Sequence, residues 1–309
     1  MENKQELPSY FTYVKIIKDS ISTDGYRLTT IEAELPRYIW AECLTHRWFG
    51  RNAQSSRAVP VKEVLRVNRE NPVFPIIWGK NKAGMSSIEE LNYIEKQQAS
   101  IIWASIAEQS FQAAEELIDL GLHKMWTNRI TEPFSRIKVV ITATEWDNFF
   151  WLRDDLDAAQ PEIVDFARKA KKAFEASTPQ ILKSGEWHLP YVNNWRDIDG
   201  TMIYLDEAHK QIPLELAKDI SASACAQVSY RKLDQTAEKA EQVRERLLGG
   251  PKPHASPYEH QGTPMKNPKG GEDYILSPNY WEKGVTSMDR SRNFLSGNLK
   301  GWLQFRQLI

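Results

Sequence analysis

The segment THRWFGRNAQSSR, residues 45–57, is dense in side chains that form hydrogen bonds. Arginines, a histidine, an asparagine, a glutamine and two serines lie close together in it. Such a stretch suits a solvated surface, and it suits equally a site that grips a phosphate and the polar edges of a planar ring. Polarity alone does not separate these alternatives, so the sequence around the segment has to decide.

The composition is that of an ordinary globular protein. The chain has 309 residues, 41% hydrophobic and 26% charged, enough for a large core and one or two domains. Its formal net charge of −1 predicts no strong binding of nucleic acid. The start of the chain lacks a signal peptide's apolar run, and no stretch approaches the ~18 apolar residues of a membrane helix. We expect no membrane contact and a cytoplasmic location, in a bacterium or a virus-infected host cell.

The sequence before and after the segment predicts a strand, a helix and a loop. Residues 26–36 (YRLTTIEAELP) alternate and are rich in β-branched side chains, as in a strand. A helix is expected to follow Pro36 and run into the polar segment. Its apolar residues follow helical spacing, at Ile39, Trp40, Cys43 and Leu44. Residues 59–87 hold prolines and glycines and are expected to be loop-rich.

The longest predicted helix covers residues 86–121. It opens with a serine and an acidic first turn and ends at Gly121. It is expected to be scaffold, with a buried apolar stripe formed by Ile94, Ile101, Ile102, Ile106, Leu117 and Leu120.

Strands and helices are expected to alternate in the remaining sequence. Residues 136–146 predict a strand by their β-branched content. Helices are predicted at 146–155, at 160–177 with Pro161 in the first turn, at 212–230, and at 234–248. The tail from 251 to 293 is rich in Pro, Gly, Asn and Ser and is expected to be extended.

Several familiar catalytic signatures are absent from the sequence. It has no GxxxxGK[ST] loop, no GxGxxG after a strand and no GxSxG. Cys43 lies in an apolar helical stripe and is expected to be packed rather than nucleophilic. His254 and His260 have no cysteine nearby, so a zinc site is weakly supported, and no metal site is predicted.

Arginines are better candidates for a ligand site. Arg47, Arg57 and Arg153 could supply forked donors to a phosphate or a carbonyl-rich ring. Ser55 and Ser56 could add hydroxyl and backbone N–H groups to a phosphate. The set suits a nucleoside monophosphate, although any one of these arginines, taken alone, is more often a surface residue.

Four segments together resemble motifs of the flavin-dependent thymidylate synthases. Residues 45–57 resemble the signature RHRxxSxNxxSxR, with matches at His46, Arg47, Asn52, Ser55 and Arg57. ATEWDNFFWLR (143–153) followed by AQPEI (159–163) resembles a second block of the family. ACAQVSY (224–230) and HASPYEH (254–260) resemble two more, which precede the signature in shorter members. The chain therefore resembles a longer form with permuted motif order.

This resemblance implies a fold and an activity. The implied fold is α+β, a mixed or antiparallel sheet packed with long helices, with a catalytic domain at 1–260 and a loop-rich extension at 261–309. The implied reaction is the reductive methylation of dUMP to dTMP. Methylenetetrahydrofolate gives the carbon and NADPH reduces bound FAD, without a cysteine nucleophile. The implied partners are dUMP, folate, NADPH and other copies of this chain in a homotetramer with shared active sites.

The resemblance also implies roles for individual residues. Arg153 matches the catalytic arginine that contacts the uracil and favours ionisation of its N3, as a fixed cation beside a developing anion would. The implied dUMP contacts are Glu42, Gln54, Ser55, Ser56, Arg57, Arg129 and Arg153. The implied FAD contacts are Thr45, His46, Arg47, Asn52, Asn148, Ser229, His254, Ser256 and Glu259.

The segment departs from the family signature at several positions. Thr45 replaces its first arginine, Gly50 its first serine, and Ala53 stands where many members have glutamate. These changes leave open a related enzyme that attaches a different group to the pyrimidine C5, such as hydroxymethyl. A non-catalytic nucleotide- or nucleic-acid-binding protein on the same scaffold is a third alternative, which the near-zero net charge disfavours.

Overall fold

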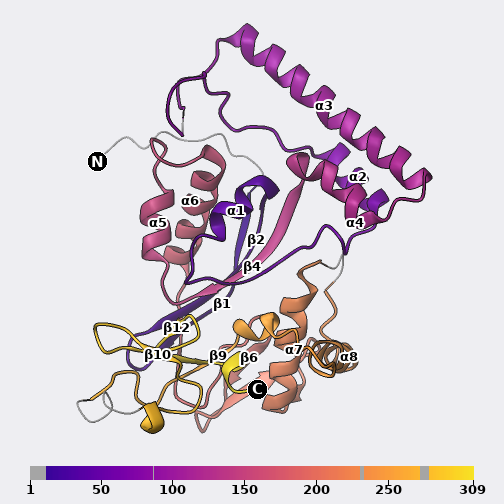
Figure 1. Cartoon of the computed structure of the whole chain (residues 1–309). Coiled ribbons are helices and arrows are strands. Elements are labelled where there is room, and N and C mark those ends of the chain that lie inside the picture. The colour runs from indigo at the N-terminus through magenta and orange to yellow at the C-terminus, as the bar shows by residue number, and fades with distance from the viewer. Residues whose placement is uncertain (1–11, 86, 230–232, 272–277) are drawn as a thin grey trace.

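A five-stranded mixed sheet underlies the fold in the computed structural model (Figure 1). The structure describes residues 12–85, 87–229, 233–271 and 278–309. Within the sheet only β1 and β5 run parallel; the other neighbours pair antiparallel, in the order β3-β4-β2-β1-β5. The strands are β1 (Tyr13–Ser22), β2 (Arg27–Pro36), β3 (Gly50–Ala53), β4 (Arg136–Ala143) and β5 (Gln180–Leu182). The predicted α+β class with a mixed sheet is confirmed.

Side-chain alternation along β4 gives the sheet an apolar and a polar face. Ile137, Val139 and Ile141 are buried in a core shared with β2 and with helices α5 (Asp147–Arg153) and α6 (Pro161–Ala176). The residues that alternate with them along β4 point to the opposite face: Arg136, Lys138, Val140 and Thr142. The positions of the polar side chains on that face depend on this alternation.

Most predicted elements are present, with bounds that differ by a few residues. The strands at 26–36 and 136–146 are β2 and β4, and the helices at 146–155 and 160–177 are α5 and α6. The helices at 212–230 and 234–248 are α7 (Leu214–Ala226) with the short 3-10 turn η3 (Gln227–Ser229), and α8 (Ala237–Leu248).

Two predictions around the opening segment are wrong in part. The helix after Pro36 is limited to η1 (Arg37–Ile39) and α1 (Trp40–Cys43), after which the chain turns. The turn is made by backbone bonds from Thr45 N to Glu42 O and from His46 N to Cys43 O, both 3.2 Å. The supposed loop at 59–87 contains α2 (Val61–Glu70), whose apolar side chains pack against a neighbouring helix.

That neighbour, α3 (Tyr93–Asp119), starts later than predicted. A capping box sets its start: Asn92 Oδ1 accepts from Glu95 N at 3.0 Å, and Glu95 Oε2 accepts from Asn92 N at 2.9 Å. Gly121, with a φ of 86°, follows its end. Within the described ranges no helix, α3 included, is both long enough and apolar enough to cross a membrane.

The buried stripe predicted for α3 is wrong. Only a different face is covered, where Ala107, Phe111 and Ala114 pack against α2 and Phe134. The helix lies along the top edge of the molecule, and its C-terminal half approaches α2, α4 (Lys124–Thr127) and the turn η2 (Asn128–Phe134) (Figure 1). The side chains expected to be buried are instead 51–83% exposed at Ile94, Ile101, Ile102, Ile106 and Leu120, and Leu117 is half-buried.

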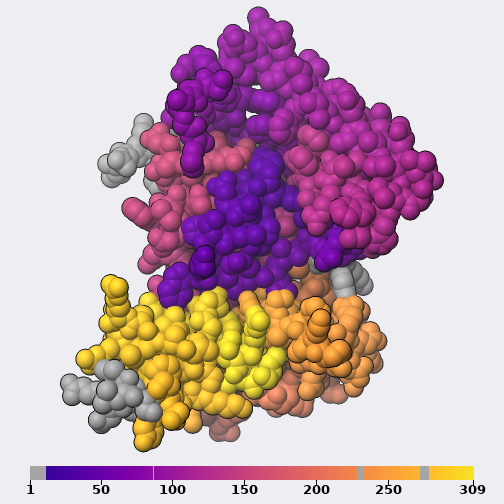
Figure 2. All heavy atoms as spheres, in the orientation of Figure 1, coloured from indigo at the N-terminus to yellow at the C-terminus, as the bar shows by residue number. Residues whose placement is uncertain are grey.

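The last third of the chain, orange to yellow, forms the lower part of the molecule in the view of Figure 2. The expected extended tail contains short elements, and its residues 272–277 lie outside the described residues. Trp302 Nε1 donates to Tyr26 O at 3.0 Å, so the C-terminal end contacts the start of β2. The division at 260/261 stays a prediction. The elements of this region are β6 (Asn193–Arg196), β7 (Met202–Leu205), β8 (Gln211–Ile212), η4 (Ser256–Glu259), β9 (Gly262–Pro264), η6 (Pro278–Tyr280), β10 (Ser287–Met288), β11 (Phe294–Ser296), β12 (Leu299–Lys300), β13 (Trp302–Gln304) and η7 (Phe305–Gln307).

Buried neutral histidines predict a loss of stability in mild acid. Burial lowers the pKa of His188 well below its ordinary value and that of His260 to about 3. An unfolded histidine titrates near pH ~6.5, so between that pH and the folded pKa the unfolded chain binds more protons. Each of these histidines should therefore lower the free energy of unfolding by about 2 kcal/mol at pH 5 relative to pH 7.

Urea unfolding at pH 7 and pH 5 measures this effect. The exposed His254 gives a matched control, because His254→Gln should leave the difference between the two pH values as in the wild type. An unfolding midpoint that does not fall between pH 7 and pH 5 would contradict the prediction.

Candidate active site

Arg153, the last residue of α5, is held by side chains of the turn after α1. Its Nε donates to His46 Nε2 at 3.1 Å, and its two terminal nitrogens donate to Glu42 Oε2 at 3.2 Å and Thr45 Oγ1 at 3.4 Å. The fold thus brings together the two sequence segments that matched different family motifs. We call these four residues the arginine cluster.

His46 is neutral in this arrangement. An Nε2 that accepts from a guanidinium carries no proton. Burial, and then the charge of Arg153, lower the pKa of His46 to about 4. Its ring packs edge-on against Phe149, with centroids 4.9 Å apart, and Phe149 itself is fully buried in the core. The histidine therefore orients Arg153 without adding positive charge.

The guanidinium remains within reach of a ligand. The Arg153 side chain is 21% exposed and that of Glu42 34% exposed. A planar cation fixed from one side can present its remaining N–H groups to a carbonyl oxygen or an anion. Chemically, the cluster can stabilise negative charge that develops on a bound ring.

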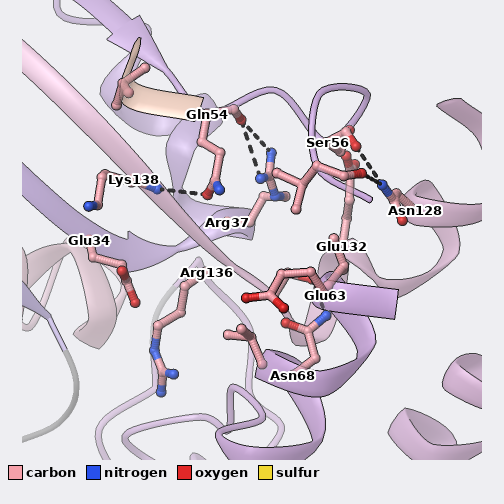
Figure 3. Close-up of a pocket in the computed structure, with 15 residues that line it drawn as sticks. Glu34, Arg37, Gln54, Ser56, Glu63, Asn68, Asn128, Glu132, Arg136 and Lys138 are labelled. Atoms are coloured by element: carbon pink, nitrogen blue, oxygen red, sulfur yellow. Dashed lines mark hydrogen bonds between the residues drawn. The ribbon is translucent and has the colours of Figure 1, made fainter. Parts of the chain in front are cut away.

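A second polar site lies on the opposite face of the sheet (Figure 3). It is a cavity of about 290 Å³ between β2, β4, α2 and η2. Figure 3 shows Gln54 and Ser56 on one side of it, with Glu34 and Arg136 across from them. Two of the predicted dUMP contacts, Gln54 and Ser56, therefore line a real cavity.

Two buried side chains hold the loop that carries these residues. Asn128 Nδ2 donates to Ser56 O at 2.6 Å and to Val59 O at 2.9 Å. Both terminal nitrogens of Arg37 donate to Gln54 O at 3.3 Å. These bonds to backbone carbonyls fix the path of the loop, from which Gln54 and Ser56 line the cavity.

The residues around the cavity are mostly polar or charged, and some of those described carry a buried atom without a partner. Arg37 Nε and Asn128 Oδ1 are buried, and neither has a hydrogen-bond partner among the described residues. Lys138 and Arg136 add positive charge, and Glu34, Glu63 and Glu132 add negative charge. Glu63 and Glu132 already pair with Arg66 at 2.9 Å and Arg129 at 3.4 Å. A polar ligand with both acceptors and donors fits such a lining, because the cavity presents side chains of both charges.

The HASPYEH segment meets β3 at one end of the sheet. His260 Nε2 bonds Asn52 Oδ1 at 3.3 Å. A Cβ on Gly50 would lie only 3.3 Å from Glu259 O, so the close approach of η4 accounts for glycine where the family signature has serine. Glu259 itself pairs with Arg306.

The other predicted FAD contacts are spread over the surface. Arg47, Asn148, His254 and Ser256 are exposed, and no hydrogen bond or ion pair joins them to one another. Ser229 ends η3, and its side chain lies outside the described residues. Their FAD role stays a prediction.

The predicted dUMP contacts fall into two groups. Glu42 and Arg153 belong to the arginine cluster, on the side of the sheet that carries α5. Gln54 and Ser56 line the cavity on the other side, with Ser55 half-buried and Arg57 and Arg129 exposed beside it. Within one chain, then, the structure does not bring all of these residues together.

Both cysteines are packed side chains, as predicted for Cys43. Cys43 and Cys225 are fully buried. Burial raises the pKa of the Cys43 thiol to about 12 and raises that of Cys225 further. Neither thiol is available as a thiolate nucleophile.

Reasoning from sequence missed the residues that shape the cavity: Arg37, Asn128, Arg136 and Lys138. The strand period contains part of the signal, because Arg136 and Lys138 alternate with apolar residues and must share one face of β4. Asn128 lies beside the predicted Arg129, but nothing local in the sequence marks it as the residue that fixes the loop.

Comparisons with known proteins give a partial likeness. No family model and no curated protein matches the sequence. Among solved structures, the chain is similar to the UMP/dUMP methylase PolB from Streptomyces cacaoi bound with 5-Br UMP, at 15% identity and a TM-score of 0.42. That alignment covers 55% of this chain and 91% of PolB.

The chain is also similar to Thymidylate Synthase X from Helicobacter pylori, solved with FAD and dUMP. The identity is 16% and the TM-score 0.35, over 48% of this chain and 67% of the other. With about half of the chain aligned at such low scores, these likenesses establish neither the family nor the reaction.

Removing the charge of Arg153 should raise the pKa of His46. Arg153→Gln takes away the second cause of the depression, so His46 should titrate above its present pKa of about 4. NMR titration of the imidazole measures the change. Arg47→Gln removes an exposed neighbouring charge and should leave the His46 pKa unchanged. A His46 pKa unaffected by Arg153→Gln would show that the two side chains do not interact.

Proposed function

We propose that this protein is a flavin-dependent enzyme that modifies C5 of a uridine monophosphate, and specifically a thymidylate synthase that converts dUMP to dTMP. The observation that carries the proposal is the arginine cluster. Residues 42–46 and Arg153, far apart in the sequence, meet within hydrogen-bond distance and leave a fixed guanidinium partly exposed.

In this proposal Arg153 binds the uracil. Its remaining N–H groups donate to the pyrimidine carbonyl next to N3, and its charge favours the N3 anion. His46 and Glu42 keep the guanidinium in place. Because His46 is neutral, it orients Arg153 without repelling it, so the cation meets the base in a fixed position.

The loop at 54–57 binds the phosphate and sugar in this proposal. Asn128 and Arg37 fix the loop backbone, and Arg57 supplies an exposed forked donor at its end. The charged side chains of Lys138 and Arg136 and the polar side chains of Gln54 and Ser56 line the cavity and suit the polar groups of a nucleotide.

Three of the predicted FAD contacts have the chemistry that a flavin nucleotide requires. Asn52 carries an amide nitrogen that donates to none of the described residues, and Arg47 and Ser256 are exposed donors. Donors of this kind suit the carbonyl-rich ring and the diphosphate of FAD. When bound, FAD would supply the hydride chemistry, with NADPH as its reductant and methylenetetrahydrofolate as the carbon donor.

We further propose that complete sites form between copies of the chain, in a homotetramer. Two observations support this. The predicted dUMP contacts lie on two sides of the sheet, so a complete set requires a second copy. The isoleucines of α3 form an apolar helix face that none of the described residues covers, which is unusual for a monomer.

Turnover tests the main proposal. Purified protein should bind FAD and form dTMP only when dUMP, methylenetetrahydrofolate and NADPH are all present. Arg153→Ala should lower kcat at least roughly 100-fold, since it removes the charge that stabilises the uracil anion. Arg290→Ala, a change of an exposed arginine elsewhere, should keep normal activity.

Mass analysis of the product separates the related activities. A methyl gain supports the thymidylate synthase, whereas a hydroxymethyl gain would replace it by the alternative that Thr45, Gly50 and Ala53 left open. UMP should be assayed beside dUMP. A folded protein that binds neither FAD nor either nucleotide would contradict the proposal as a whole.

The oligomeric state of variants tests whether the apolar face of α3 is an interface between copies of the chain. Ile102→Glu should reduce the mass of the assembly in light scattering, because a charge at a buried apolar contact is costly. Gln211→Glu adds the same charge to an exposed position on β8, in another part of the chain, and should leave the assembly intact. An unchanged mass for Ile102→Glu would place any interface elsewhere.

A further inference from the structure

A continuous line of side-chain hydrogen bonds crosses the polar face of the five-stranded sheet. It links β1 to β3 through residues of β2, β4 and two loops, and all of its members except Asn52 are fully buried. We call it the sheet relay. Its bonds are Ser20 Oγ to His188 Nδ1 at 2.9 Å, His188 Nε2 to Thr30 Oγ1 at 2.8 Å, Thr30 Oγ1 to Thr142 Oγ1 at 2.6 Å, Thr142 Oγ1 to His260 Nδ1 at 2.8 Å, and His260 Nε2 to Asn52 Oδ1 at 3.3 Å.

The strand register accounts for the line. Thr30 of β2 lies directly opposite Thr142 of β4, and both point to the polar face. His188 and His260 reach this face from segments joined by two backbone bonds, His188 N to Gly262 O at 2.8 Å and Gly262 N to His188 O at 3.2 Å. The pairing of these segments therefore places one imidazole at each end of the threonine pair.

With the Asn52 amide oxygen toward His260, every bond in the relay has one direction. An amide oxygen only accepts, so His260 Nε2 must carry a proton, and in a neutral ring Nδ1 then accepts from Thr142. Because the Thr142 hydroxyl donates its proton to His260, Thr30 must donate to Thr142. His188 Nε2 must then donate to Thr30, and His188 Nδ1 accepts from Ser20.

The far end favours the same direction. In the reverse direction Ser20 Oγ would accept from His188, and its own buried O–H would have no acceptor among the described residues. A buried hydroxyl proton without an acceptor is unfavourable. Burial lowers the pKa of both histidines, so both rings are neutral at pH 7, as the single direction requires.

We propose that the sheet relay is a positioning device that fixes the Asn52 amide with its oxygen toward His260 and its NH2 group toward the ligand. Asn52 is partly exposed, in the segment 45–57, and its Nδ2 donates to none of the described residues. The ligand must therefore offer an acceptor, a carbonyl oxygen or a ring nitrogen, at this point. His260 and Thr142 are positioning residues that act through Asn52. Only the identity of that ligand as a flavin rests on the proposed function.

The tautomers of the histidines test the relay without any ligand. Solid-state 15N NMR of the full chain, labelled at histidine, distinguishes protonated from unprotonated ring nitrogens. His188→Gln and His260→Gln assign the signals by their loss. At pH 7 both histidines should carry their proton on Nε2 alone. A proton on Nδ1 of His260 would overturn the proposal.

Thr142→Val tests whether the direction is transmitted across the sheet. The change removes the hydroxyl at nearly constant volume and disconnects Ser20, His188 and Thr30 from Asn52. In one direction of the remaining bonds the Thr30 hydroxyl then has no acceptor, and in the other direction the Ser20 hydroxyl has none. The two directions become similar in energy, so His188 should show both tautomers, while His260 keeps its proton on Nε2. Ser20→Ala, which removes only the terminal donor, should leave both histidines as in the wild type. A His188 that stays in one tautomer in a folded Thr142→Val protein would overturn transmission; if that variant fails to fold, the wild-type tautomers still decide.

Asn52→Asp tests the outward donor. A carboxylate keeps an acceptor for His260 but offers no NH2 group to the ligand, so the His260 tautomer should be retained. FAD affinity, measured by fluorescence titration, should fall at least roughly 5-fold, as expected for a lost hydrogen bond. Unchanged FAD affinity would overturn the outward donor. If the wild type binds no FAD, the proposed function fails, and the tautomers still decide the relay.

Discussion

The pairing of β4 between β2 and β3 is the constraint on which the cavity and the sheet relay depend. Because the side-chain period of a strand is two, this register sends Ile137, Val139 and Ile141 into the core and sends Lys138 and Thr142 to the opposite face. A slip by one residue would bury Lys138 and expose the apolar row. Burial of the apolar row thus sets the register, and the register fixes where the charged and hydroxyl groups lie.

The apolar side of the sheet supports the arginine cluster in the same indirect way. Phe149 is fully buried, and His46 packs against its edge, so the position of the imidazole follows from core packing. The imidazole in turn accepts from Arg153 and gives the guanidinium one orientation. A catalytic cation held in this way needs no rearrangement when charge develops beside it.

Sequence patterns predicted the parts of this structure that follow from local periodicity. β2, β4 and α6 were identified because alternation and amphipathic spacing are local properties, and the α+β class followed from them with the resemblance. The sequence did not predict that the isoleucine face of α3 is exposed, because an apolar stripe has the same pattern whether the chain itself or another surface covers it. His46, Thr45, Glu42 and Arg153 were named by resemblance, but their mutual contacts depend on the turn after Cys43, which no local signal placed. The sheet relay joins residues from Ser20 to His260 and could be found only from coordinates.

The two groups of predicted dUMP contacts give the account its most demanding consequence. If Arg153 binds the uracil and the loop at 54–57 binds the phosphate, one nucleotide must bridge residues that a single chain keeps on different sides of its sheet. A crystal structure of the protein with FAD and dUMP tests this directly. The account predicts a uracil against Arg153, a phosphate against Ser55 and Arg57 of a second copy, and a flavin beside Asn52. A nucleotide bound elsewhere, or one that leaves Arg153 without contact, would contradict it.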